Sequence, residues 1–142
     1  MKTDFRKMDE RPEEKFGGET IRIYAATHKN CKKYGDSSVH LLHVGAAQHP
    51  DVVIEDAERD DSRPDNISDK NDTYCELTGL YHLWKHVSDV DAVGLCHYRR
   101  YFVKKAKLTK HPESIILSSQ TLMDALHKHD IILGTPSRKR GG

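Results

Sequence analysis

The sequence reads Ala92-Val93-Gly94-Leu95-Cys96-His97-Tyr98-Arg99-Arg100-Tyr101-Phe102 at its most informative point. The apolar run 92–96 is typical of a buried strand. The histidine and the paired arginines that follow would carry hydrogen-bond donors and positive charge to the end of that strand. Ligands of open α/β sheets bind at the carboxyl ends of the strands, and a planar guanidinium group bonds two phosphate oxygens at once. The stretch therefore predicts an edge that binds a phosphate or diphosphate.

Apolar runs on both sides of this stretch predict the other elements. Residues 21–26 and the weaker run 39–44 are typical of strands, and the polar, turn-rich segment 51–70 is predicted to be a long loop. A helix is expected at 119–128, with Leu122, Ala125 and Leu126 facing inward, and a last strand at 131–133. This order of elements predicts an α/β fold with a mainly parallel sheet flanked by helices.

The clearest helix is predicted to begin near Asp72. Thr73 and Glu76 have the spacing of a capping box, in which two side chains satisfy free amides of the first turn. Apolar side chains then recur at helical spacing and are expected to face the core: Leu77, Leu80, Tyr81, Trp84 and Val87.

The composition describes one domain of 142 residues, or part of one, with a formal net charge of +1. Such a charge gives no general attraction to nucleic acid or to an anionic membrane. Acidic residues predominate in 51–72 and basic residues from 97 onward. These two regions either face each other across a cleft or form two solvated surfaces. The three cysteines lack the spacing of a disulfide scaffold.

Both ends of the chain are expected to lie outside the folded part, which is predicted to be 19–137. Residues 1–18 are charged, lack the apolar segment of a secretory signal and are predicted to be a disordered leader, and 138–142 a frayed tail. No apolar run approaches the ~20 residues that span a bilayer. We therefore expect a cytoplasmic protein.

A first polar cluster, Thr27-His28-Lys29, directly follows the first predicted strand. It either contacts a nucleotide or phosphate, or forms an ordinary transition from strand to loop.

A second polar cluster, 65–71, precedes the predicted helix and contains Asn66, Ser68 and Asn71. Its side chains either form turns and cap the helix, or they lie at an anion-binding site formed by the unpaired amides at the N-terminus of the helix. Glu76 lies one turn further on, where it either pairs with an arginine, accepts from a sugar hydroxyl, or only completes the capping box.

The third cluster consists of His97, Arg99 and Arg100. In a continuing strand, alternation puts His97 and Arg99 on one face and Arg100 on the other. One face would then meet the ligand, and the remaining arginine would pair with an acid such as Glu76. The alternative is a basic loop with both arginines solvated. We favour burial because aromatic residues flank the pair, and a buried arginine must be paired.

Several blocks, in this order, closely resemble bacterial capsular and exopolysaccharide biosynthesis proteins, whose domain is regarded as a GT-A-type glycosyltransferase. The resemblance covers about 21–136 and rests on these blocks: Thr27-His28-Lys29, His43-Val44-Gly45-Ala46, Asp65-Asn66-Ile67-Ser68-Asp69-Lys70-Asn71, Tyr74-Cys75-Glu76-Leu77-Thr78, Tyr81-x-x-Trp84-Lys85 and Gly94-Leu95-Cys96-His97-Tyr98-Arg99-Arg100-Tyr101-Phe102.

The resemblance implies an incomplete GT-A-like, Rossmann-like fold that binds a nucleotide sugar. The donor is expected to be a UDP-hexose, and the acceptor a glycan or lipid-linked glycan. Typical GT-A enzymes end the strand that matches 92–96 in a D-x-D motif, which holds a metal ion on the diphosphate. Histidine and arginine follow the strand here, so no divalent metal is expected, and Arg99 with Arg100 or His97 would substitute for its charge.

Family members are longer, so 19–137 are expected to be the donor-binding half. An inverting transferase needs a carboxylate base near the acceptor, and Asp60, Asp61 and Asp65 are the candidates in this chain. Metal-site spacings such as C-x-x-C and H-E-x-x-H are absent from the sequence. Asp89-Val90-Asp91 resembles D-x-D but precedes the strand that such a motif should follow.

Three functions stay open. The leading hypothesis is the donor-binding half of a glycosyltransferase of capsular or exopolysaccharide biosynthesis. Peripheral attachment to the inner membrane and formation of an oligomer are both compatible with this hypothesis. The second is a truncated, non-catalytic module that binds a nucleotide sugar. The third is polyanion or RNA binding by the basic second half. It ranks lowest because no nucleic-acid motif is present, and no nucleic-acid partner is expected.

Overall fold

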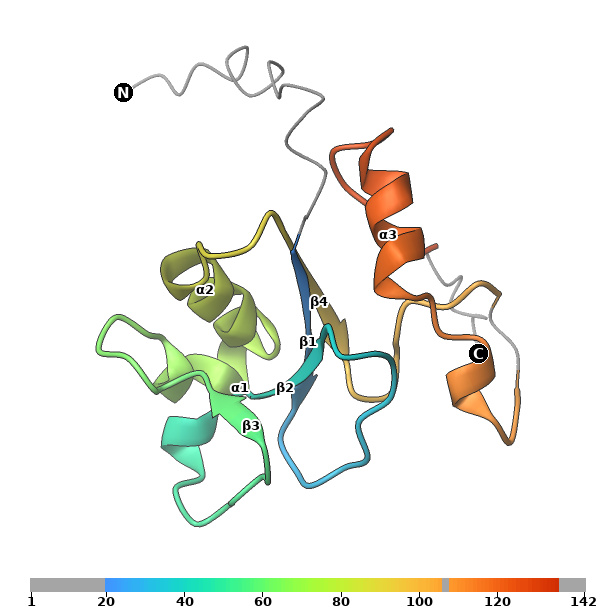
Figure 1. Cartoon of the computed structure of the whole chain (residues 1–142). Helices are drawn as coiled ribbons and strands as arrows, with labels where there is room; N and C mark the ends of the chain where they lie inside the picture. Colours follow the sequence, from blue (N-terminus) through green and yellow to red (C-terminus); the bar gives the residue numbers. More distant parts are fainter. Residues whose placement is uncertain (1–19, 106–107, 136–142) are drawn as a thin grey trace, which may run out of the picture.

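A four-stranded parallel sheet forms the centre of the protein (Figure 1). The computed structural model describes residues 20–105 and 108–135, so the predicted leader and tail lie outside the described residues. The strands are β1 (Ile21–Thr27), β2 (Val39–His43), β3 (Ala57–Arg59) and β4 (Ala92–His97), and their order across the sheet is β3-β2-β1-β4. The predicted α/β class and parallel sheet are confirmed.

Strand β1 is the point at which the strand order reverses. The chain moves from β1 to β2 and β3 on one side, and β4 then pairs with the other side of β1. Ala26 of β1 is paired with Leu42 of β2 and with His97 of β4, so the carboxyl ends of all three strands lie at one edge. A reversal of this kind opens a crevice between the first strand and its later neighbour, and ligands of such sheets bind there.

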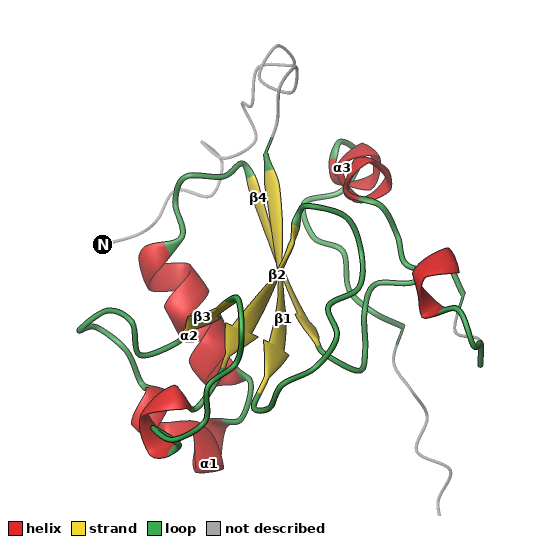
Figure 2. Ribbon diagram, turned by 60° about the horizontal axis from the view of Figure 1, so that its bottom comes forward, coloured by secondary structure: helices red, strands yellow, loops and turns green. Residues whose placement is uncertain are grey.

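Helices cover both faces of the sheet, as Figure 2 shows. Helix α2 (Leu77–His86) follows the short helix α1 (Asn71–Tyr74) and packs Leu83 against Tyr24 and Leu42. Helix α3 (Ser119–Leu126) lies on the opposite face, where Leu122 joins Ile23 and Leu41. Successive residues of β1 therefore face different helices, and both faces of the strand are buried. Such burial explains its continuous apolar run.

The predicted capping box is wrong, because the helix is interrupted. Cys75 separates α1 from α2 with φ 51° and ψ −131°, and neither helix has a side-chain cap. Asn71 instead donates to the Cys75 carbonyl at 2.7 Å and holds this turn.

The predicted inner face of this helix is wrong for most of its residues, although Val87 does pack against the core. Leu77, Leu80 and Trp84 are exposed, whereas Thr78, Gly79, His82 and Leu83 are buried. A side chain at Gly79 would lie 2.9 Å from Val44 Cγ1. The glycine therefore lets α2 approach β2 closely, and this approach decides which face turns inward.

Three further boundaries differ from the predictions. The segment 51–70 contains β3 and a 3-10 turn at Ser68–Lys70, and further 3-10 turns lie at Ala46–Gln48 and Pro112–Ser114. The predicted strand 131–133 is wrong, because these residues pair with no strand of the described chain and Ile131 and Leu133 are exposed. Helix α3 ends two residues earlier than predicted and buries Leu122 and Met123.

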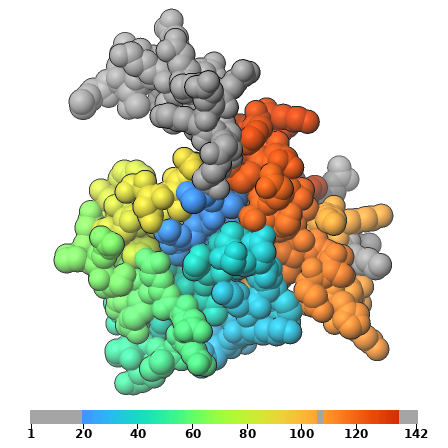
Figure 3. All heavy atoms as spheres, viewed as in Figure 1, coloured from blue at the N-terminus to red at the C-terminus, as the bar shows by residue number. Residues whose placement is uncertain are grey.

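The carboxyl-terminal part, α3 included, lies along one side of the molecule, and the segment with α1 and α2 lies along the other (Figure 3). Within 20–105 and 108–135, no helix is both long and apolar enough to cross a membrane.

Candidate functional site

At the sheet edge formed by the carboxyl ends of β1 and β4, the side chains of His28, Lys29 and Arg99 gather around the ring of Tyr98. The ring centroids of His28 and Tyr98 are 5.7 Å apart. Lys29 Nζ lies 5.6 Å from the Tyr98 ring, and Arg99 Cζ lies 5.3 Å from it. The Tyr98 amide donates to the Ala26 carbonyl at 3.0 Å, which fastens the turn after β4 to β1. The structure thus joins the first and third predicted clusters, whereas the central role of Tyr98 was not predicted.

A tight turn follows β4 in place of the predicted continuing strand. The Arg100 amide donates to the His97 carbonyl at 2.8 Å, and Tyr98 and Arg99 occupy the turn. The Arg99 amide donates to His97 Nδ1 at 3.2 Å, so this nitrogen carries no proton and Nε2 carries it. Glu76 Oε1 lies 3.6 Å from that Nε2. The predicted pair between Glu76 and an arginine is therefore wrong, because the histidine faces this carboxylate.

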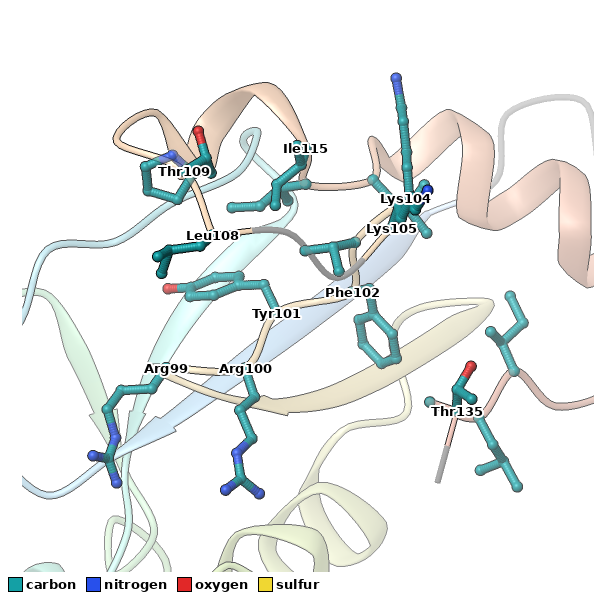
Figure 4. A pocket seen from close by; sticks show the side chains of 17 residues that line it. Arg99, Arg100, Tyr101, Phe102, Lys104, Lys105, Leu108, Thr109, Ile115 and Thr135 are labelled. Carbon is teal, nitrogen blue, oxygen red and sulfur yellow. The ribbon is translucent and has the colours of Figure 1, made fainter. Parts of the chain in front are cut away.

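Arg99 and Arg100 are exposed, and the predicted burial of the pair is wrong. Among the described residues, neither guanidinium group has an ion pair, and that of Arg99 lies beside the Tyr98 ring. Figure 4 shows the two side chains extending to the same side, away from Leu108 and Ile115. Exposed guanidinium groups without a protein carboxylate retain their donors for an anionic ligand.

Thr27 shapes the loop after β1 from a buried position. Its hydroxyl donates to the Lys29 carbonyl at 2.7 Å and accepts from the Lys29 amide at 3.2 Å. His28 and Lys29 are exposed beyond this turn. Thr27 therefore positions the two side chains that approach Tyr98, and a ligand would meet those two.

Asp60 is a buried carboxylate that connects the loops after β2 and β3. It accepts from the amides of Gly45 and Ala46 at 2.8 and 3.1 Å and from the Ser68 hydroxyl. Ser68 is itself buried and accepts from the Ala47 amide at 3.0 Å. The side chains of Asp60 and Ser68 therefore hold this corner of the edge together.

Asn66 and Asn71 also make contacts within the protein. Asn66 Oδ1 accepts from the Ser68 amide at 3.1 Å, which is a turn of the kind that asparagine favours. Asn71 donates to Thr78 Oγ1 at 2.8 Å and packs against Gly45, where an added Cβ would lie 2.7 Å from Asn71 Cγ. Besides this lack of space for a side chain, Gly45 has φ 69°, a left-handed conformation that glycine adopts readily.

The three carboxylates predicted as candidates for a base all have partners in the protein. Besides the buried Asp60, Asp61 is paired with Arg59 Nε at 2.9 Å, and this pair lowers the pKa of Asp61. Asp65 accepts from the Tyr81 hydroxyl at 2.7 Å, which lowers the pKa of Asp65. Asp61 and Asp65 are thus weakened as bases, and Asp60 is held by its hydrogen bonds.

The residues at the end of β4 do not fit a divalent cation. The turn at the end of β4 carries His97, Tyr98 and Arg99, none of which is a carboxylate, and carboxylate oxygens are the side-chain ligands that hard divalent cations prefer. Within the described part of the chain, no group of three His, Cys, Asp or Glu side chains could hold a metal ion.

A pocket of about 660 Å³ adjoins the turn after β4 (Figure 4). Residues 99–105, 108, 109, 112, 115–117 and 132–135 line it. Arg99 and Arg100 thus lie where the edge at Tyr98 meets this pocket.

The sheet order and the cationic side chains at the ends of β1 and β4 are typical of α/β domains that bind ligands at the edge of a parallel sheet. The chain belongs to the family described as Domain of unknown function (DUF4422), whose profile matches residues 22–140. No curated protein matches the chain.

A solved structure, the apo form of the WbbM bifunctional glycosyltransferase, is similar to the chain with 31% sequence identity and a TM-score of 0.61. The similarity covers 75% of this chain and 21% of the WbbM chain. The chain therefore spans about a fifth of that protein and shares the fold of that part.

Proposed function

We propose that this chain is the donor-binding part of a glycosyltransferase that takes a sugar from a nucleotide sugar, with UDP-hexose as the donor. The observation that carries the proposal is the meeting of Lys29 and Arg99 on the Tyr98 ring, at the reversal point of the sheet. The similarity to a bifunctional glycosyltransferase supports the same conclusion. The capsular or exopolysaccharide pathway is part of this proposal.

The reaction would break the bond between the anomeric carbon and the donor diphosphate and form a bond from that carbon to an acceptor hydroxyl oxygen. The hydroxyl proton passes to a base, and the nucleoside diphosphate leaves with an additional negative charge. Preorganised cations at the leaving oxygen stabilise this charge most as it develops. In this proposal Arg99 and Arg100 take that role, and Lys29, which also lies beside the Tyr98 ring, adds to it.

His97 and Glu76 have a positioning role in this proposal. The His97 ring accepts the Arg99 amide and faces the Glu76 carboxylate, so it fixes the turn that carries both arginines. Thr27 fixes the turn that carries His28 and Lys29. Asn66, Ser68 and Asn71 form hydrogen bonds within the protein that stabilise the neighbouring loops of the same sheet edge.

A second candidate is a module that binds the nucleotide sugar without transferring it. The observation in its favour is that Asp60, Asp61 and Asp65 are all bonded within the protein. A base would then have to come from elsewhere, and donor binding would be this chain's own contribution.

Calorimetric titration with UDP and with UDP-sugars tests the proposal. Arg99→Ala should weaken binding about 10- to 100-fold, because hydrogen bonds to charged groups contribute about 1.5–3 kcal/mol. Lys105→Ala should have a much smaller effect, and Lys128→Ala, which removes an exposed cation beyond α3, should have none. Equal losses in Arg99→Ala and Lys105→Ala would contradict the site.

Product analysis in the same samples separates the two candidates. Hydrolysis or transfer of the bound donor supports the enzyme, and binding with an intact donor supports the module. In a full-length relative with the same turn, transfer that is abolished by EDTA and restored by manganese would overturn the role of the arginines in place of a metal.

A further inference from the structure

Two histidine rings lie one turn apart on α2, far from the arginines in sequence. His82 and His86 are separated by four residues, a spacing that makes two side chains neighbours on a helix. Their ring centroids are 5.1 Å apart, with an interplanar angle of 57°. A tetrahedral ion with Zn–N bonds of about 2.0–2.1 Å would hold two imidazole centroids roughly 5 Å apart. The two rings thus already have the separation of ligands that share one metal ion.

Each ring is fixed through its Nε2 atom by an acceptor outside α2. His82 Nε2 lies 2.7 Å from Glu58 Oε1 of β3, beside which the helix runs in Figure 2, and this hydrogen bond lowers the pKa of Glu58. His86 Nε2 lies 2.6 Å from the Asp65 carbonyl oxygen. A carboxylate and a carbonyl oxygen only accept hydrogen bonds, so both Nε2 atoms carry the ring proton. Both Nδ1 atoms therefore keep a lone pair, as a metal-binding imidazole requires.

His82 Nδ1 is a buried nitrogen without a partner. The His82 side chain is fully buried, and in the part of the chain that the structure describes its Nδ1 makes no hydrogen bond. Such a nitrogen is destabilising unless something binds it. Histidines that bind metals usually donate their other ring N–H to a carboxylate or a backbone carbonyl, and this pair has one of each. His86 is only partly buried, so a cation can approach the pair from that side.

The ligand atoms determine which cations fit. Imidazole nitrogen suits Zn²⁺, Cu²⁺ and Ni²⁺, whereas Mg²⁺ and Ca²⁺ prefer oxygen. The nearby carboxylates are already engaged. Glu58 accepts from His82, and Asp65 accepts from Tyr81 and pairs with Lys85. Among the described residues no third His, Cys, Asp or Glu completes the set, so water would fill the remaining coordination positions.

We propose that His82 and His86 bind one divalent transition-metal ion, such as Zn²⁺, through their Nδ1 atoms. The ion would join two turns of α2. Through the Nε2 partners it would also strengthen the attachment of this helix to β3 and to the loop that contains Asp65. The site uses none of the residues proposed to bind the donor, so it does not depend on the proposed function.

Calorimetric titration of the full chain, freed of metal with EDTA and dialysed, tests the site with Zn²⁺ as the probe. One equivalent should bind, and Mg²⁺ should bind at least tenfold more weakly. His86→Gln removes one ligand from a partly exposed position and should weaken Zn²⁺ binding at least tenfold. Zn²⁺ affinity that is the same in His86→Gln and the wild type would overturn the proposal, as would Mg²⁺ that binds as tightly as Zn²⁺.

Two control variants distinguish the pair from other possible zinc ligands of the chain. His111→Gln removes an exposed histidine outside α2, and Cys75→Ser removes an exposed thiol. Both should bind Zn²⁺ as the wild type does. A loss of binding in either control that equals the loss in His86→Gln would overturn the site.

Glu58→Gln tests the partner of His82, because it replaces a carboxylate with a neutral acceptor. Removal of such a partner typically weakens metal binding 10- to 100-fold, and a loss of about that size is expected. Unchanged affinity would overturn the assignment of Nδ1 as the ligand atom.

NMR of the wild-type protein does not depend on the folding of any variant. The ring protons of His82 and His86 should shift or broaden together as the first equivalent of Zn²⁺ is added. Zn²⁺ should also raise the urea midpoint of the wild type and have little effect on that of His86→Gln. Zn²⁺ that perturbs other histidines and leaves these two rings unchanged would overturn the proposal.

Discussion

His97 Nε2 lies 3.6 Å from Glu76 Oε1, and this contact connects the end of β4 to the junction between α1 and α2. On its other side, the His97 ring accepts the Arg99 amide at 3.2 Å. Burial lowers the pKa of His97, Glu76 raises it, and the two neighbouring arginines lower it further. The pKa of His97 therefore depends on how the turn places Glu76 and the two arginines around the ring.

Replacing the carboxylate should lower the pKa of His97 further. Glu76→Gln keeps the size of the side chain and removes the negative charge that favours the imidazolium. The pKa can be followed by NMR titration of the ring protons. Glu113→Gln is the control, because Glu113 lies 3.6 Å from a different histidine, His111. A His97 pKa that is unchanged or raised in Glu76→Gln would contradict the contact.

The single tryptophan should contribute little to stability. Trp84 is 70% exposed and contacts Lys85 Nζ at 4.1 Å from its ring centre. Trp84→Ala should lower the free energy of unfolding by less than about 1 kcal/mol, as expected at an exposed site. Leu83→Ala, one residue away and buried, should cost about 2–5 kcal/mol.

Urea denaturation followed by circular dichroism compares these two variants directly. If Trp84→Ala costs as much as Leu83→Ala, the side chain is buried and the orientation of α2 is wrong. Acrylamide should also quench the fluorescence of Trp84 strongly in the folded wild-type protein.

Helix α2 shows why local periodicity can mislead. The apolar stripe of Leu77, Leu80 and Trp84 is present, but it faces solvent. The inner face contains Gly79 and His82, which no hydrophobic pattern identifies. Glu58 of β3 satisfies His82 Nε2 at 2.7 Å. Because this partner is distant in sequence, the inner face could not be predicted from the helix alone.

The strands show the same distinction. β1, β2 and β4 could be predicted because each contains an apolar run. The expected burial of 92–96 is wrong, because β4 is an edge strand of the sheet and Val93 is exposed. β3 was missed because Ala57-Glu58-Arg59 is polar and pairs with β2 alone. Conversely, 131–133 is apolar but pairs with no strand in the described chain, so it forms none.

The location of the candidate site at the strand ends could be predicted from the sequence, but the contacts between its side chains could not. The cationic residues after β1 and β4 follow apolar runs, and parallel strands bring their ends together. The contact of Tyr98 with His28 depends on the turn that follows β4, which the sequence does not specify. The burial of Ser68 against Asp60 depends on a loop-to-loop contact that is likewise not local.

A methyl group at Gly79 should destabilise the protein. The added Cβ would lie 2.9 Å from Val44 Cγ1 and 3.0 Å from Leu42 Cδ2, and both neighbours are buried. Overpacking of this kind costs about 1–3 kcal/mol, which exceeds the gain of about 1 kcal/mol that alanine gives in a helix. Gly79→Ala should therefore lower the urea midpoint.

The control for this variant is Gly134→Ala, where the added Cβ meets no atom of the described part of the chain within 4 Å. It should leave the midpoint nearly unchanged. A Gly79→Ala protein as stable as Gly134→Ala would mean that α2 does not approach β2 as closely as the structure shows.

Burial of His43 should make the protein less stable in mild acid. The side chain is 1% exposed, its Nε2 has no hydrogen-bond partner among residues 20–105 and 108–135, and burial lowers its pKa. The unfolded chain takes up this proton near pH 6.5, so below that pH it binds more protons than the folded protein does. The stabilisation is complete above about pH 6.5 and is lost as pH falls toward the folded pKa, by at most about 1.4 kcal/mol per pH unit.

Urea unfolding at pH 7.5 and at pH 5.5 measures this loss, and His43→Leu should lose less stability between the two conditions than the wild type. The leucine also removes the unpaired nitrogen, so the variant should be at least as stable as the wild type at pH 5.5. NMR titration of the wild-type His43 ring gives the pKa directly and does not depend on folding of the variant. A ring pKa at or above 6.5, or equal pH dependence in the two proteins, would mean that protons reach His43 in the folded state without cost.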